Sequence, residues 1–370
     1  MADDLQLAFC IDDRFAPHLA VCLHSIQTHL GHGMAARAHI IGDLSPDVAR
    51  RLGSMAGDRL DLAFHVRVPD FSHLHISPTF ASRLSIATYH RLALPELLPG
   101  RDRILYLDAD MLALTDLTPL WETDLHGCAA AVVQDYFLGT EKRWERLGLP
   151  HPEYFNAGMM LMDLDRWRKE KLAACVAEAV AEHPDWEYND QDGLNVVLNG
   201  QCLYVDSRWN ATTTRLRAGA VENPALIHFT GQEKPWHVSS VHPCRDAYRD
   251  AKQHTPWKEA PLEHFLDHVD RHLLDELLRA RPDGGCIAIY GCGARGRRLA
   301  LYLRDQHPGY TIRFMVDRSA AGPFEGIPVH RHMPDNTIDA LDALLIASVP
   351  FRDEILASLP PGLSNQIPVI

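Results

Sequence analysis

The chain lacks the features of a secreted, membrane-spanning or disulfide-bonded protein. Its first residues, MADDLQLAFC, carry no basic segment before a long apolar stretch, so no secretory signal peptide is expected. No run of residues reaches the roughly 18 apolar positions of a spanning helix. The eight cysteines are scattered without a CxxC pair, which favours reduced thiols in a cytoplasm over a disulfide framework or a zinc site.

Positive charge is also scarce. The chain has 36 Lys and Arg against 49 Asp and Glu, a formal net charge of −13. An acidic protein is a poor general binder of polyanions, so we expect no nucleic-acid partner and at most peripheral contact with a membrane. An anionic substrate would therefore need a bound metal or a few placed cations. Nothing in the sequence indicates an oligomeric state.

The length of 370 residues fits two domains. In the first part of the chain, apolar runs typical of buried strands alternate with segments of helical spacing. The expected strands are Leu5–Ile11, Ala38–Ile41, Leu62–Val66, Arg103–Leu107, Cys128–Val133 and Asn156–Met162. The expected helices are Phe15–Thr28, Ser45–Met55, Phe80–Leu98 and Asp165–Glu182. This alternation predicts an α/β fold with a mostly parallel sheet flanked by helices.

The composition changes after about residue 250. Pro261–Arg281 has helical spacing with many charges, and a new apolar strand begins at Cys286. We therefore predict a first domain at 1–255, a helical connector at 256–284 and a small C-terminal α/β domain at 285–370.

The strongest local pattern is Ile104-Leu-Tyr-Leu-Asp108-Ala-Asp110-Met, an apolar strand that runs into two aspartates. Residues i and i+2 of a strand point to the same side, so both carboxylates can face one divalent cation. Ligands of open α/β sheets gather at this carboxyl edge, and oxygen ligands suit Mg²⁺ or Mn²⁺. An isolated Asp-x-Asp is more often a solvated strand end or a helix N-cap, and the preceding apolar strand favours the metal site here.

A second segment, Ala225-Leu-Ile-His228-Phe-Thr-Gly231-Gln-Glu-Lys234-Pro-Trp236-His237, supports a metal site. His228 ends an apolar strand and is either a metal ligand or a core histidine. Gly231 lets the backbone approach a phosphate. Lys234 either places a cation on that phosphate or lies on plain surface.

Further motifs follow along the chain. They are Asp12-Asp13 with Phe15, Ser85-Ile-Ala-Thr-Tyr89-His-Arg91-Leu, Leu117-Thr-Pro-Leu-Trp121, Tyr154-Phe-Asn156-Ala-Gly158 and Asp190-Gln191-Asp192-Gly-Leu-Asn195. Together with the two segments above, they resemble glycosyltransferase family 8, and especially its bacterial lipopolysaccharide α-galactosyl- and α-glucosyltransferases. The resemblance runs from about Leu5 to His237. It implies a GT-A fold for the first domain, with a UDP-sugar and Mn²⁺, or else Mg²⁺, as cofactors.

The resemblance also implies a role for individual residues. The implied metal ligands are Asp108, Asp110 and His228. The implied contacts to the nucleotide and its pyrophosphate are Cys10, Asp12, Phe15, Asp108, Ala109, Gly231 and Lys234. The residues implied around the donor sugar and the reaction are Arg91, Asp135, Asn156, Asp190 and Gln191. Asp12 is expected at the uracil edge, and Phe15 is expected to stack on the base.

Several of these residues have a structural alternative. Phe15 is also suited to be the first core residue of its helix, and Arg14 stands where relatives carry a small polar residue. Asn156-Ala-Gly158 is also typical of a tight turn. Asp190 and Asp192 are also suited to be N-caps of a helix at Gly193–Leu198, and Arg91 to pair with a carboxylate such as Asp108.

The activity that the resemblance implies is transfer of a hexose, galactose or glucose, from UDP to a hydroxyl of a saccharide or glycolipid acceptor, with retention. Retention needs a covalent intermediate or attack from the face of the leaving group. We favour same-face attack assisted by Gln191, with Asp190 as the alternative nucleophile. The expected location is the cytoplasm, either free or peripheral at the inner face of the membrane. The alternative function is a nucleotide-sugar sensor without turnover.

The C-terminal part carries Ile287-Ala-Ile-Tyr-Gly291-Cys-Gly293-Ala-Arg-Gly296, then a helix, and an apolar strand that ends at Asp317. A strand, a GxGxxG turn and a helix followed by an acid are typical of a dinucleotide site. This part also resembles the small Rossmann-like modules attached to bacterial sugar-modifying enzymes. It predicts either a nucleotide site at Gly291–Gly296 or a fold that kept the turn for packing. A second alternative function, an NAD-dependent sugar-modifying enzyme, rests on this loop alone.

Overall fold

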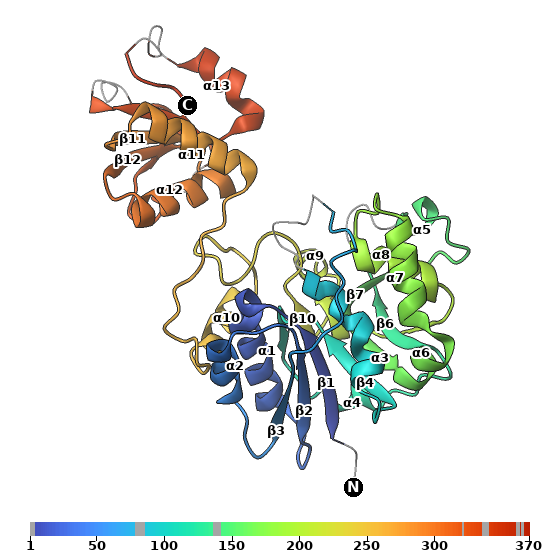
Figure 1. The fold of residues 1–370 in the computed structure, drawn as a ribbon. Helices are drawn as coiled ribbons and strands as arrows, with labels where there is room; N and C mark the ends of the chain where they lie inside the picture. The colour runs from blue at the N-terminus through green and yellow to red at the C-terminus, as the bar shows by residue number, and fades with distance from the viewer. Residues whose placement is uncertain are drawn as a thin grey trace. The chain divides into compact units, whose positions relative to one another are not determined.

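The computed structural model describes residues 4–77, 86–135, 142–319, 322–334, 340–359, 363 and 366–370. The chain divides into two compact units, one of Met1–Pro235 with His242–Ala260, the other of Trp236–Val241 with Pro261–Ile370 (Figure 1). Within the described residues, no helix has the length and apolar character needed to cross a membrane.

A seven-stranded sheet forms the centre of the first unit, in the order β3-β2-β1-β4-β7-β6-β8. Its strands are β1 Leu5–Cys10, β2 Ala36–Ile41, β3 Leu60–His65, β4 Arg103–Leu107, β6 Ala130–Gln134, β7 Phe155–Asp163 and β8 Cys202–Tyr204. Strand β7 runs antiparallel to both of its neighbours, and the other neighbouring strands pair in parallel. The predicted α/β fold with a mostly parallel sheet is therefore confirmed.

Each face of this sheet is covered by helices (Figure 1). On one face, Leu7 and Phe9 of β1 pack with Leu19 and Leu23 of helix α1, Ala16–His29. Successive strand residues point to opposite faces, so Ala8 joins the other cluster with Tyr106 and residues of the helices α6 Leu164–Glu170, α7 Leu172–Glu182 and α8 Asn189–Leu198. Fully burying one such leucine contributes about 1.5–3 kcal/mol, which is why the apolar runs predict these strands well.

Two predicted helices differ from the observed ones. Residues 86–93 of the helix expected at 80–98 form the 3₁₀ helix η2, Ile86–Ala93, followed by α3, Leu94–Leu97. Its first residues, 80–85, lie outside the described part of the chain. The helix expected at 165–182 is two helices, α6 Leu164–Glu170 and α7 Leu172–Glu182, because Lys171 between them has φ 54°.

The other helices of this unit are short. They are η1 Asp13–Phe15, α2 Pro46–Gly53, α4 Thr118–Trp121, α5 Arg143–Arg146, α8 Asn189–Leu198, η3 Ser207–Asn210, α9 Thr213–Arg217 and α10 Arg245–Lys252.

A second, three-stranded sheet lies beside the end of β4. Strand β10, Leu226–His228, is its centre, antiparallel to β5, Met111–Ala113, and parallel to β9, Ala211–Thr212. In this register His228 pairs with Met111 and with Thr212. The small sheet therefore joins three segments that are far apart in the sequence.

The second unit contains a parallel sheet in the order β13-β12-β11-β14. Its strands are β11 Gly285–Tyr290, β12 Tyr310–Val316, β13 Val329–His330 and β14 Ala343–Ile346, and its helices are α11 His268–Ala280, α12 Ala294–Gln306, η5 Val349–Phe351 and α13 Arg352–Ser358. Leu273 and Leu277 of α11 pack in one core with Ile287 and Ile289 of β11. Packing thus assigns the helix of the predicted connector to this unit, while the boundaries at 255 and 285 stay a prediction.

The glycine loop joins β11 to α12 as its pattern predicts. A Cβ on Gly296 would lie 1.9 Å from the carbonyl oxygen of Gly291, so the third glycine lets the helix approach the strand. Gly291 itself has φ 104°, which disfavours any other residue. Asp317, the acid of the predicted dinucleotide pattern, accepts a hydrogen bond from the amide of Cys292 at 2.8 Å. The nucleotide site at this loop stays a prediction.

Candidate active site

A cavity of about 700 Å³ opens in the first unit beyond the carboxyl ends of β1 and β4. Every residue predicted to contact the metal, the nucleotide or the sugar lines it: Cys10, Asp12, Phe15, Arg91, Asp108, Ala109, Asp110, Asp135, Asn156, Asp190, Gln191, His228, Gly231 and Lys234. The strand edge at which parallel sheets bind ligands thus collects these residues from segments spread over the first 234 positions.

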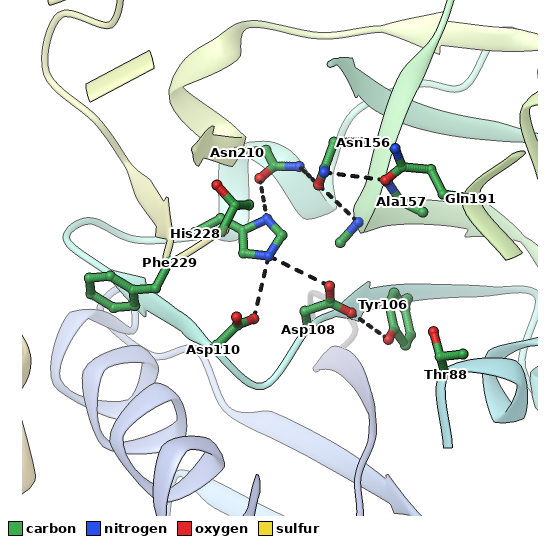
Figure 2. A network of polar contacts seen from close by, with 12 residues as sticks. Thr88, Tyr106, Asp108, Asp110, Asn156, Ala157, Gln191, Asn210, His228 and Phe229 are labelled. Carbon is green, nitrogen blue, oxygen red and sulfur yellow. Dashed lines mark hydrogen bonds and ion pairs between the residues drawn. The ribbon is translucent and has the colours of Figure 1, made fainter. Parts of the chain in front are cut away.

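Asp108, Asp110 and His228 form one cluster at the cavity wall. Each offers one ligand atom, and these atoms lie within 4.8 Å of one another. The two aspartates belong to the turn between β4 and β5 rather than to a strand, so their shared direction comes from the turn. The Nε2 of His228 lies 3.6 Å from Asp108 Oδ2 and 3.3 Å from Asp110 Oδ1 (Figure 2).

This cluster fits a hard divalent cation. Two carboxylate oxygens and one imidazole nitrogen, all near one point, are a ligand set suited to Mn²⁺ or Mg²⁺. The other carboxylate oxygen of Asp110, Oδ2, lies 2.6 Å from the ammonium of Lys234. Burial alone would raise the pKa of Asp110, but Lys234 and His228 outweigh it and hold that pKa well below its usual range. Asp110 is therefore ionised and can bind a cation.

His228 is oriented by a residue that the sequence did not single out. Its Nδ1 lies 2.9 Å from Oδ1 of Asn210, the last residue of η3, which is fully buried. A histidine whose other nitrogen is held in this way has a fixed ring orientation. Nothing in the pattern around Asn210 marks it, since its partner lies 18 residues away.

Gly158 of β7 leaves room for the same cluster. A Cβ at this position would lie 2.3 Å from His228 Cε1 and 2.8 Å from Asp108 Oδ2. Its backbone carbonyl also accepts the amide of Asp108 at 2.8 Å. The glycine is therefore needed for space and not for a special backbone angle.

Arg91 connects Asp108 of the cluster to Asp190 of helix α8. Its Nη2 lies 3.2 Å from Asp108 Oδ1, and its Nε lies 3.1 Å from Asp190 Oδ2. Its Nη1 donates to the carbonyl of Ala157 at 2.7 Å. Burial raises the pKa of Asp190, and the Arg91 guanidinium opposes that rise. The expected pairing of Arg91 with a carboxylate is thus present twice.

Gln191 has all of its amide positions in use. Its Oε1 accepts from Ala157 N at 3.1 Å and from Asn156 Nδ2 at 3.3 Å, and its Nε2 donates to Asp135 Oδ2 at 3.1 Å and to Tyr154 Oη at 3.2 Å. Asn156 itself belongs to strand β7, so the alternative of a tight turn is wrong. The Gln191 amide is held rigidly, facing the cavity.

The alternative of helix caps for Asp190 and Asp192 is also wrong. Helix α8 begins at Asn189, so both aspartates lie in its first turn. Asp192 is fully buried, accepts from Tyr154 Oη at 2.7 Å and from Arg143 Nε at 3.0 Å, and so supports the Tyr154 that contacts Gln191.

The segment after β1 contributes Asp12 and Phe15 to the lining of the cavity. Asp12 accepts from Arg14 N at 3.0 Å and pairs with Arg14 Nη2 at 2.9 Å. Phe15 lines the cavity and also packs on the core of the first unit, while its stacking on a base stays a prediction. Burial raises the pKa of the Cys10 thiol, which therefore stays neutral. Across the cavity, Gly231 has φ 84°.

Comparison with known proteins identifies this arrangement. A sequence profile described as "Glycosyl transferase family 8" matches residues 6–240. "General stress protein A" of Bacillus subtilis (strain 168) is 30% identical in an alignment of length 277 that covers 68% of this chain and 94% of that protein. "Lipopolysaccharide 1,2-glucosyltransferase" of Escherichia coli (strain K12) is 34% identical in an alignment of length 190 that covers 47% of this chain and 56% of that protein.

Solved structures of glycosyltransferases have a similar fold. The crystal structure of the galactosyltransferase LgtC with donor and acceptor sugar analogues has a TM-score of 0.62 and 25% identity, covering 72% of this chain and 99% of that chain. The glycosyltransferase GlyE of Streptococcus pneumoniae TIGR4 covers 99% of this chain and 90% of its own at a TM-score of 0.53 and 17% identity, a likeness of fold alone. The predicted GT-A type fold is confirmed. The chain belongs to glycosyl transferase family 8 and is a glycosyltransferase.

Proposed function

We propose that the chain is a retaining hexosyltransferase that moves galactose or glucose from a UDP-sugar to a hydroxyl of a saccharide or glycolipid acceptor and needs Mn²⁺. The observation that carries the proposal is the cluster of Asp108, Asp110 and His228 on the wall of a 700 Å³ cavity. A carboxylate pair with an imidazole would hold the cation, which, when bound, offsets the charge of a nucleotide pyrophosphate. Mg²⁺ is the alternative ion.

The pyrophosphate would lie between the cluster and the segment after β10. The side chain of Lys234 is 15% exposed and lines the cavity, with its ammonium beside Asp110. A buried cation stabilises a leaving diphosphate because its charge grows as the glycosidic bond breaks. The left-handed backbone of Gly231 keeps side-chain bulk away from the same place. The nucleoside would extend toward Asp12 and Phe15.

The hexose would lie against Arg91, Asn156, Asp190 and Gln191. In the step that we propose, the bond from the anomeric carbon to the UDP oxygen breaks and a bond to the acceptor oxygen forms on the same face. The acceptor proton passes to the departing phosphate oxygen. Gln191, held by Asp135 and Tyr154, would stabilise the positive charge that develops on the sugar.

The acceptor and the location follow from similarity and composition. Two of the similar proteins carry names of lipopolysaccharide glucosyl- and galactosyltransferases. A saccharide, free or lipid-linked, is therefore the acceptor class that we propose. All eight cysteines are free, which supports a reducing, cytoplasmic location, with contact at the inner membrane face if the acceptor is a lipid.

The test measures UDP release from UDP-galactose, UDP-glucose and UDP-N-acetylglucosamine, with Mn²⁺, with Mg²⁺ or with EDTA. We expect slow, metal-dependent hydrolysis of UDP-galactose or UDP-glucose, and faster release when a saccharide acceptor is added. Stabilisation by UDP without release from any donor, acceptors included, would favour a sensor. No stabilisation by UDP at all would refute the proposed site and direct attention to the loop at Gly291–Gly296.

A further inference from the structure

Amide side chains beside the candidate metal cluster, two of them half-buried and one fully buried, form a continuous chain of hydrogen bonds. It runs from Gln191 through Asn156 and Asn210 to His228, over 3.3, 2.9 and 2.9 Å (Figure 2). Asn210 is fully buried, and His228 is 4% exposed. The chain therefore connects the sugar side of the cavity to the metal side without passing through solvent.

Two backbone amides fix the direction of this chain. The N–H of Gly158 donates to Asn156 Oδ1 at 3.1 Å, and the N–H of Ala157 donates to Gln191 Oε1 at 3.1 Å. A backbone N–H can only donate, so both acceptors must be oxygens. Asn156 is thereby oriented, with its Nδ2 toward Gln191 and its Oδ1 toward Asn210.

The orientation of Asn156 determines the orientation of Asn210 and, through it, which ring nitrogen of His228 carries the proton. Because Asn156 Oδ1 is an acceptor, the group of Asn210 that faces it must be the NH₂, and Oδ1 of Asn210 must face His228. An oxygen at 2.9 Å requires a proton on Nδ1 of His228. In the neutral ring, Nε2 then carries the free lone pair, and it is Nε2 that faces Asp108 and Asp110.

We propose that Asn210 is a positioning residue that sets the tautomer of His228 for metal binding and couples it to the donor-sugar side through Asn156. This inference rests on the proposed function, since it requires a cation at the cluster. A flipped Asn156 would lose the bonds to Gly158 and Gln191 and would present an NH₂ to that of Asn210. Donor orientation and metal affinity should therefore change together when this chain is broken.

The experiment compares Asn210→Leu with Asn210→Asp and measures Mn²⁺ affinity by the loss of the free Mn²⁺ signal in electron paramagnetic resonance. The leucine variant has no acceptor for Nδ1, so its Kd should rise roughly ten- to one-hundred-fold. The aspartate variant keeps the acceptor, so its Kd should stay within about threefold of the native value. It cannot donate to Asn156, so its kcat should fall at least about tenfold.

Asn156→Ser keeps the native Asn210 and tests the inference independently if Asn210→Leu does not fold. Without the amide of Asn156, Asn210 is free to flip, and the Mn²⁺ Kd should rise at least about threefold. Circular dichroism in EDTA checks that each variant is folded.

The outcomes separate the inference from the function. A folded Asn210→Leu protein that binds Mn²⁺ as tightly as the native chain would overturn the inference, and so would equal losses in the leucine and aspartate variants. If Asn210→Leu is unfolded, an unchanged Kd in Asn156→Ser overturns it. Failure of the native protein to bind Mn²⁺ would refute the proposed function instead.

Discussion

The guanidinium of Arg91 lies 3.2 Å from the carboxylate of Asp108. Arg91 also contacts Asp190, so one buried cation lies between two carboxylates of the cavity. Removing it would leave both without their cation, and an uncompensated buried charge typically costs about 3–5 kcal/mol. Arg91→Met should lower the free energy of unfolding by that amount, measured by urea denaturation.

Arg91→Lys serves as the control for this prediction. It keeps the charge but loses the fork that reaches both carboxylates and Ala157, so its loss of stability should be smaller. A methionine variant within about 1 kcal/mol of the native protein would contradict the assignment of Arg91 as the bridge.

Gly158→Ala should disable the metal cluster while leaving the fold intact. The added methyl would collide with the His228 ring and with Asp108, and displacement of these ligands should weaken Mn²⁺ binding at least about tenfold. The measurement is a Mn²⁺ titration of UDP release. Gly53→Ala is a matched control, because a Cβ there meets nothing within 4 Å, and its titration should match that of the native protein.

Asp190 distinguishes the two routes to retention. If the acceptor attacks from the face of the leaving group, Asp190→Asn should lower kcat but leave measurable turnover, because the Asp190 carboxylate then forms no covalent bond to the sugar. Mass spectrometry of native protein quenched during turnover should find no hexose attached to Asp190. A trapped adduct on that residue, with a variant reduced to background, would establish a covalent intermediate and exclude the route that we propose.

His39 should make the first unit sensitive to acid. It is 5% exposed, with Nδ1 3.1 Å from His65 Nε2. Burial, then repulsion from His65 and Arg37, lowers the pKa of His39 from 6.5 to about 4. The unfolded chain thus binds more protons between these values, so stability should fall as the pH drops from 6.5 toward 4.

Urea midpoints at several pH values between 7 and 4 test this expectation. In His39→Leu, the decrease over this range should be smaller. An equal decrease in both proteins would place the acid sensitivity elsewhere.

Much of this fold could be predicted because buried strands appear in the sequence as apolar runs. Strands β1 and β4 were expected within a residue of their observed ends, since both are buried on two faces. The break at Lys171 was not predictable, because a lysine carries no signal for a left-handed backbone. The 3₁₀ form of Ile86–Ala93 was missed for a similar reason, since its apolar spacing also suits an α-helix.

In the candidate site, too, some residues could be predicted from the sequence and others could not. Residues whose type implies charge, such as Asp108 and His228, could be named from motifs. Asn210 could not, because a single buried asparagine has no periodicity and its importance lies in its partners, Asn156 of β7 and His228 of β10. Even the Asp108–Asp110 pair was expected on a strand, whereas a turn sets its geometry.

The pairing of Met111 with His228 across β5 and β10 determines when the ligand cluster can form during folding. The ligand cluster is closed by a contact between residues 118 positions apart, counted from Asp110 to His228, and such long-range contacts form late in folding. During synthesis, a ribosome must release the segment at 226–228 before the cluster can exist. Shorter nascent chains would hold two aspartates and no imidazole, so metal capture would report that synthesis has passed His228.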